Sequence, residues 1–173
     1  MNIPRIAKFE KVSFEQFKKD WLNLYPFLSE NYLETIYDKI PLPKRATSGS
    51  AGYDFFLPDR LNLLKNESVV IPTGIRCWID EGWVLKAYPR SGHGFNYGVH
   101  LANTTGIIDS DYYNAKNEGH IMIKLVNDSI LAKDIEAESH TAFCQGIFEL
   151  FGITVDDEVE AERVGGFGST DKK

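Results

Sequence analysis

The sequence is poor in the residues that build metal sites and disulfide frameworks. Its 173 residues include only two cysteines, Cys77 and Cys144, which lie far apart and form no CxxC pattern. The four histidines also show no metal-ligand spacing: His93, His100, His120 and His140. We therefore expect two buried free thiols, ordinary strand and loop histidines, and neither a zinc site nor a disulfide.

Basic residues are scarce relative to acidic ones. The chain has 19 Lys and Arg against 25 Asp and Glu, a net charge of -6, which argues against a protein that coats nucleic acid. A small anionic substrate stays open if a few Arg or Lys side chains are focused locally or a divalent metal carries the charge. There is no long apolar span, and residues 1–12 contain no signal-peptide core. We expect no membrane contact and a cytoplasmic location.

What the chain does have is enough apolar sequence for one domain. Its hydrophobic content is 43%, which is sufficient for a real core at this length. In SFEQFKKDWLNLY the apolar residues recur every three or four positions, which predicts an amphipathic helix beginning near Phe14 behind a capping box formed by Ser13 and Gln16. Pro26 ends that helix. The stretch ENYLETIYDKI predicts a second short helix.

From Tyr53 onward the pattern is that of β-strands. Short runs rich in β-branched and aromatic residues are separated by Gly, Pro, Asn and Asp at strand-length intervals. This pattern predicts an all-β protein, a compact barrel or jelly roll with an N-terminal helical extension. We divide the chain into a helical extension at residues 1–40, a β-barrel at 41–160 and a mobile, polar, glycine-rich arm at 161–173.

Two carboxylates in the stretch NTTGIIDSDY, residues 103–112, are the first candidates for chemistry. If the run is a strand, alternation places Asp109 and Asp111 on one face and Ile108 and Ser110 on the other. An acidic pair of this kind is more often a solvated face than a site. Its neighbours in the sequence are what make it a candidate.

Two further segments can bind anions. In PRSG, Arg90 offers a bidentate fork and Ser91 a hydroxyl, both on a turn after a strand, although a plain surface turn has the same pattern. Gln145 lies in an otherwise apolar strand, where its amide bonds either to the backbone or to a ligand. The arm offers hydroxyls, glycines and an aromatic ring that has no core to join. Its candidates are Gly166, Phe167, Gly168, Ser169 and Thr170.

Together these segments resemble the trimeric all-β dUTPases, the deoxyuridine triphosphate nucleotidohydrolases. That family is marked by five short motifs in fixed order, and all five occur here between about residue 43 and residue 170. They are AGYD at 51–54, PRSG at 89–92, NTTGIIDSDY at 103–112, FCQGIF at 143–148 and RVGGFGST at 163–170. The resemblance implies a dUTPase-like distorted jelly-roll barrel and Mg²⁺-dependent hydrolysis of dUTP to dUMP and pyrophosphate.

The resemblance also implies a role for each residue of the third motif. Asp109 would deprotonate the water that attacks the α-phosphorus, while Asp111 would be a structural or subunit-contact carboxylate. Asn103 and the backbone through about Gly106 would read the uracil edge, with Ile108 also among the substrate-binding residues. Tyr112 would pack beneath the deoxyribose and leave no room for a ribose 2′-hydroxyl, which separates dUTP from UTP.

The other motifs would hold the triphosphate and close the site. Arg90, Ser91 and Gln145 would meet the phosphates, and Gly92 would allow close backbone approach. Asp54 would hold Mg²⁺ through water. The arm would bring Arg163, a ring to stack on uracil and small residues to close on the outer phosphates, namely Phe167, Gly168, Ser169 and Thr170. A homotrimer with sites shared between subunits is implied.

Two other functions remain as alternatives. A dCTP deaminase has the same fold, but it needs a second Arg four residues beyond Arg90, where this chain has Gly94. A regulatory protein that binds partners through the N-terminal helices on a dUTPase scaffold is the other alternative. The chain also departs from the family after Tyr112, where YNAKNE before Gly119 predicts a lengthened loop beside the site.

Overall fold

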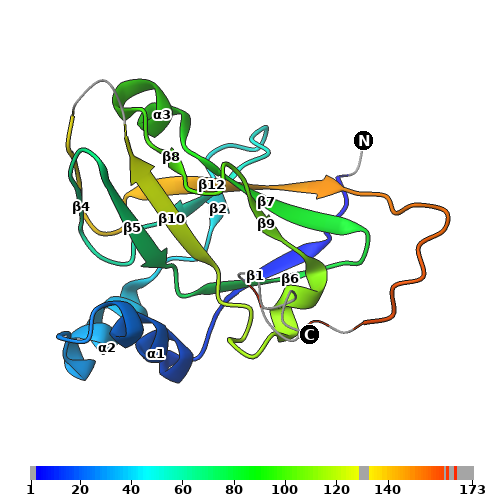
Figure 1. Ribbon diagram of the computed structural model, residues 1–173, viewed down its shortest axis with the longest axis horizontal. Helices are drawn as coiled ribbons and strands as arrows, with labels where there is room; N and C mark the ends of the chain where they lie inside the picture. The colour runs from blue at the N-terminus through cyan, green and yellow to red at the C-terminus, as the bar shows by residue number, and fades with distance from the viewer. Residues whose placement is uncertain (1–2, 129–132, 162, 164–165, 167–173) are drawn as a thin grey trace.

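The computed structural model describes residues 3–128, 133–161, 163 and 166 (Figure 1). None of the helices in this part of the chain is both long and apolar enough to cross a membrane. In chain order the elements are β1 (Ala7–Lys11), α1 (Phe14–Leu24), α2 (Glu30–Lys39), β2 (Lys44–Arg45), β3 (Tyr53–Phe56), β4 (Leu61–Leu63), β5 (Glu67–Pro72), β6 (Ile75–Ile79), β7 (Trp83–Pro89), α3 (Ser91–Tyr97), β8 (His100–Leu101), β9 (Gly106–Ile108), the 3-10 helix η1 (Ser110–Asn114), β10 (Met122–Asn127), β11 (Ile135–Ala137) and β12 (Ala142–Leu150).

The strands form four antiparallel sheets. The largest has the order β2-β3-β12-β7-β9, and a three-stranded sheet has the order β5-β10-β8. The pairs β1-β6 and β11-β4 form the two smaller sheets. In Figure 1 the long strands β7 and β12 run side by side, with β5 and β10 crossing beside them and the two N-terminal helices gathered at one end. The all-β architecture predicted from the sequence is confirmed.

Strand β7 lies between β12 and β9 and so connects the segments that carry the candidate residues. In the β7–β12 pair, Tyr88 lies opposite Gln145. In the β7–β9 pair, Leu85 lies opposite Ile108. The inward side chain of Leu85 is fully buried, and burial of such apolar residues is what fixes the register of these strands.

Both predicted helices are present. Helix α1 begins at Phe14, and Ser13 Oγ accepts a hydrogen bond from the backbone N–H of Gln16 at 3.2 Å. The helix ends ahead of Pro26, which cannot continue it. The apolar faces of α1 and α2 join the same core as the barrel strands, so this part of the N-terminal region is packed against the barrel. The buried residues that do this are Phe17, Trp21, Leu33, Ile36 and Ile40.

The N-terminal region also contributes a strand that the sequence analysis did not predict. Strand β1 pairs with β6 over its whole length. The end of α2 packs against the turn between β5 and β6. Gly74 in this turn has a φ of 74°, and a Cβ there would lie 2.5 Å from Ile40 Cδ1. Only glycine combines this conformation with this close approach.

Two short helical segments replace a predicted turn and part of a predicted strand. Residues after Arg90 form α3, although two glycines in SGHGFNY disfavour a helix. Strand β9 ends at Ile108, and Asp109 is the N-terminal cap residue of η1. The premise that Asp109 and Asp111 lie on a strand is therefore wrong, although both carboxylates face the same arginine, Arg163.

The two cysteines are free and buried, as predicted. Burial raises the pKa of both the Cys77 and the Cys144 thiols. Because the thiolate is the reactive form, neither side chain is a candidate nucleophile.

Candidate active site

A cavity of about 560 Å³ lies beside the turn between β8 and β9. The turn is tight: Thr104 has a φ of 64°, and Thr105 N–H donates to the Asn103 carbonyl at 2.6 Å. Apolar residues of β5 and β10 form the opposite wall, including Val70 and Ile123. A space of this size, mostly apolar with backbone groups at one edge, suits a nucleoside.

Several of the predicted site residues line this cavity together. They come from the β8–β9 turn, from β9, from η1 and from the C-terminal segment, so the fold brings together residues 60 positions apart. These residues are Asn103, Gly106, Ile108, Tyr112 and Arg163.

Tyr112 is held rigidly in the cavity wall. Its side chain is buried, its hydroxyl donates to the His120 carbonyl at 2.9 Å, and the hydroxyl accepts from Asn117 Nδ2 at 2.7 Å. Burial raises the pKa of Tyr112, so its hydroxyl stays neutral. Gly119 has a φ of 68°, and a Cβ there would lie 2.7 Å from the Tyr112 carbonyl oxygen. The lengthened loop after Tyr112 thus forms a brace around the tyrosine.

Asp109 is paired with Arg163, an arginine of the C-terminal segment that lines the cavity. Arg163 forms an ion pair with Asp109 through Nη2 and another with Asp111 through Nε at 2.7 Å. Its guanidinium also lies 5.8 Å from the centre of the Tyr112 ring. Gly166 lies close to the same ring, since a Cβ there would be 2.7 Å from Tyr112 Cε2. The start of the arm therefore already lies on the cavity within one chain.

The remaining predicted residues form a second cluster around the end of β7. Arg90 Nε lies 3.2 Å from Asp54 Oδ1, and Arg90 Nη1 donates to the Ala142 carbonyl at 3.4 Å. Gln145 Nε2 donates to the Pro89 carbonyl at 3.3 Å. This is the first of the two alternatives predicted for its amide, a hydrogen bond to the backbone. Ser91 and Gly92 begin α3 next to this cluster.

The two clusters lie at opposite ends of β7. Asp109 follows Ile108, which pairs with Leu85 near the beginning of β7, whereas Arg90 directly follows the end of that strand. Six residues of extended strand correspond to roughly 20 Å. Within one chain, most of the length of β7 therefore separates Asp109 from Arg90.

No cluster of three or more His, Cys, Asp or Glu able to hold a metal occurs among the described residues. Asp54 is instead paired with Arg90. The predicted arm residues Phe167, Gly168, Ser169 and Thr170 lie outside the described residues.

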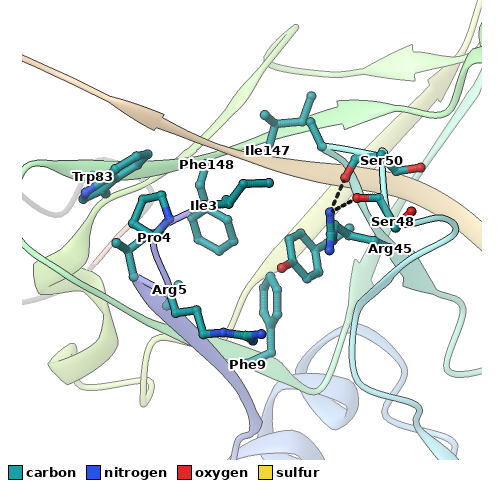
Figure 2. A pocket seen from close by; sticks show the side chains of 15 residues that line it. Ile3, Pro4, Arg5, Phe9, Arg45, Ser48, Ser50, Trp83, Ile147 and Phe148 are labelled. Atoms are coloured by element: carbon teal, nitrogen blue, oxygen red, sulfur yellow. Dashed lines mark hydrogen bonds between the residues drawn. The ribbon is translucent and has the colours of Figure 1, made fainter. Parts of the chain in front are cut away.

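A second cavity, of about 500 Å³, lies between β1 and the largest sheet (Figure 2). Phe9, Trp83 and Phe148 line it, and Arg45 at its edge donates to the carbonyls of Ser48 and Ser50 at 2.9 and 3.0 Å. None of the predicted site residues lines this cavity, so the cavity beside the β8–β9 turn is the candidate site.

A sequence profile of the family described as dUTPase matches residues 38–171. The chain belongs to the dUTPase family. A deoxyuridine 5′-triphosphate nucleotidohydrolase of Lactococcus lactis is 38% identical over 134 residues, covering 76% of this chain and 88% of the relative. One from Buchnera aphidicola is 37% identical over 147 residues, covering 81% and 93%.

Solved dUTPase structures have the same fold. The crystal structure of dUTPase from Streptococcus mutans superposes with a TM-score of 0.61 at 29% identity, covering 84% of this chain and 97% of that chain. The dUTPase of Staphylococcus bacteriophage 80alpha, solved with dUPNHPP, superposes with a TM-score of 0.56 at 25% identity, covering 75% and 91%. The dUTPase-like fold and the family membership inferred from the five motifs are both confirmed.

Asn117 and His120, which brace Tyr112, are functional candidates that the sequence analysis missed. Both lie in or next to the lengthened loop YNAKNE. The signal available was the position of this loop directly after the third dUTPase motif. Neither residue belongs to the motif itself, and their contacts form only when the chain is folded.

Proposed function

We propose that this member of the dUTPase family hydrolyses dUTP to dUMP and pyrophosphate, with Asp109 as the general base for water attack on the α-phosphorus. The observation that supports the proposal is the cavity beside the β8–β9 turn, which is lined by Asn103, Tyr112 and Arg163, the ion-pair partner of Asp109. The cavity has the size of a nucleoside.

The walls of the cavity account for selection of the base and the sugar. Backbone N–H and C=O groups between Asn103 and Gly106 would pair with the uracil edge, and cytosine would leave such buried groups unpaired at a cost of about 1–3 kcal/mol each. The Tyr112 ring would lie beneath the deoxyribose. Because its hydroxyl is fixed by two hydrogen bonds, the ring cannot move aside for a 2′-hydroxyl without breaking them.

Asp109 suits the role of general base by its position and its exposure. Its side chain is 42% exposed, so a water molecule can reach it, and Arg163 lies beside it. Once substrate is bound, Arg163 is also placed to stabilise negative charge on the reacting phosphate.

The cluster at the end of β7 would bind the triphosphate. Arg90 offers parallel donors, Ser91 a hydroxyl, Gly92 close backbone approach, and Gln145 lies next to the same strand end. Mg²⁺ fits this donor set: it is typically held by substrate phosphates with one or two carboxylates, and Asp54 is the described carboxylate of the cluster. When bound, the ion would neutralise charge on the triphosphate, with Asp54 contacting it through water.

In the assembly that we propose, the two clusters that act on one dUTP come from different chains. Asp109 of one subunit would face Arg90 of a neighbour, which is a head-to-tail contact that closes into a ring. A homotrimer with three shared sites is the assembly that we propose. Phe167 would stack on uracil, and Gly168, Ser169 and Thr170 would close over the phosphates. We place the reaction in the cytoplasm.

A pyrophosphate-release assay with dUTP, UTP, dCTP and dTTP in parallel, with and without Mg²⁺, tests this function. We expect turnover of dUTP that depends on Mg²⁺ and exceeds turnover of UTP by at least about tenfold, because one displaced polar contact is worth roughly 1.4 kcal/mol or more. Ammonia release from dCTP would instead identify a deaminase. A dUTP preference over UTP below tenfold would refute the role of Tyr112.

A further inference from the structure

Helix α1 carries a buried carboxylate that the proposed reaction does not use. Asp20 is only 7% exposed. Its Oδ2 accepts from Gln16 Nε2 at 2.7 Å and lies 2.6 Å from His120 Nδ1. A carboxylate so deeply buried is costly unless it is paired, so the contact with His120 is a specific feature of this core.

The second bond of His120 determines which of its ring nitrogens carries the proton. The backbone N–H of Gly74 donates to Nε2 at 2.8 Å, so Nε2 is the acceptor and Nδ1 carries the hydrogen that Asp20 accepts. The imidazole is fully buried. Each ring nitrogen therefore makes one hydrogen bond, and the two bonds together hold the His120 side chain in one position.

The backbone of His120 in turn holds Tyr112. Its carbonyl accepts the Tyr112 hydroxyl at 2.9 Å and Asn117 Nδ2 at 3.5 Å. Asn117 Nδ2 also lies 2.7 Å from the Tyr112 hydroxyl. Helix α1 is thus connected to the ring beneath the proposed sugar site through His120, whose side chain bonds to Asp20 and whose carbonyl bonds to Tyr112.

Two other contacts tie the same helix to the cavity. Glu118, in the loop that braces Tyr112, accepts from Ser13 N–H at 2.7 Å and from Ser13 Oγ at 2.6 Å. Burial raises the pKa of the Glu118 carboxyl, but the hydrogen bonds from Ser13 outweigh burial and hold this pKa below its usual value. At the other end of α1, the Tyr25 hydroxyl donates at 3.1 Å to the carbonyl of Val70, which lines the cavity.

We infer that Asp20 is a positioning residue for the sugar site: through His120 it holds Tyr112 in the place where the ring excludes a ribose 2′-hydroxyl. This inference rests on the proposed function, because it concerns the choice between deoxyribose and ribose. It gives the N-terminal helices, which lie outside the five dUTPase motifs, a part in specificity. Without the Asp20 carboxylate, the Nδ1–H of His120 is buried and unpaired, and the loop that carries the His120 carbonyl relaxes away from Tyr112.

The test compares Asp20→Ala with Asp20→Asn and with Leu33→Ala. In Asp20→Ala, kcat/KM for dUTP divided by kcat/KM for UTP should fall by about tenfold. The change should lie mainly in the KM values and not in kcat. Asp20→Asn keeps an oxygen that accepts from His120 and should restore most of the ratio. Leu33→Ala removes a buried side chain of α2 that takes no part in these hydrogen bonds. It should lower thermal stability and keep the ratio of the unmodified protein.

The ratio decides the outcome. An unchanged ratio in folded Asp20→Ala, or an equal loss in Leu33→Ala, overturns the inference. If Asp20→Ala does not fold, Tyr112→Phe breaks the series at its other end while sparing Asp20. A ratio in Tyr112→Phe equal to that of the unmodified protein then overturns the inference instead.

A binding measurement separates failure of this inference from failure of the proposed function. Calorimetry with dUMP and UMP needs no turnover. If the unmodified protein releases no pyrophosphate and does not prefer dUMP, the proposed function has failed. If it prefers dUMP and Asp20→Ala prefers it equally, only the positioning role of Asp20 has failed.

Discussion

Asp109→Asn is expected to lower kcat for dUTP by about 10²–10⁴-fold, the range typical for loss of a general base. The carboxamide has the size of the carboxylate but does not take up a proton at neutral pH. Binding of dUMP should remain within a few-fold, because the cavity walls are unchanged. Pyrophosphate release and calorimetry with dUMP measure the two effects separately.

Asp111→Asn is the matched control for this substitution. Asp111 also pairs with Arg163, so both variants lose one ion pair with the arm, but only one loses the proposed base. We expect Asp111→Asn to keep activity within about tenfold of the unmodified protein, since an exposed ion pair contributes about 1 kcal/mol or less. Equal losses in the two variants would mean that Asp109 anchors the arm and performs no proton transfer.

A chain that ends at Ala161 should fold normally and lose at least about 100-fold in kcat, because it lacks the groups that cover the substrate and stabilise charge on it. The fold should persist since, among the described residues, the buried core lies before the arm: its last fully buried members are Phe143 and Cys144. Circular dichroism during thermal unfolding and pyrophosphate release with dUTP measure the two expectations.

Full-length Arg163→Ala shows how much of this loss comes from one side chain. Arg163 is the described arm residue that contacts Asp109, so its removal should reproduce part of the loss. A truncated chain with the kcat of the full-length protein would exclude the arm from catalysis.

The sequence was sufficient to predict those parts of the fold whose signals are local. Helix α1 begins at the predicted residue because Ser13 caps it and its apolar face repeats at helical spacing. The strands were recognisable from β-branched residues and turn residues. Helix α3 was not, because its two glycines disfavour a helix and none of its residues is buried.

Motif order predicted which residues line the cavity better than it predicted their geometry. It identified the residues that meet in the cavity, among them Asn103, Tyr112 and Arg163. The pairing of Glu118 with Ser13 and of His120 with Asp20 joins residues about 100 positions apart. Such pairs leave no mark on local periodicity, and the family motifs do not cover residues before Pro41, so neither kind of reasoning found them.

The claim on which the whole account depends is that each site takes Asp109 from one chain and Arg90 from another. Arg90→Ala removes the proposed phosphate-binding side chain and is expected to be nearly inactive, as is Asp109→Asn. Mixing the two variants, after partial unfolding and reassembly, tests the claim directly by pyrophosphate release from dUTP. In a randomly mixed ring, about one site in four should combine an intact Asp109 with an intact Arg90, so the mixture should regain roughly a quarter of the original activity. A mixture that stays as inactive as its two components would contradict the shared site.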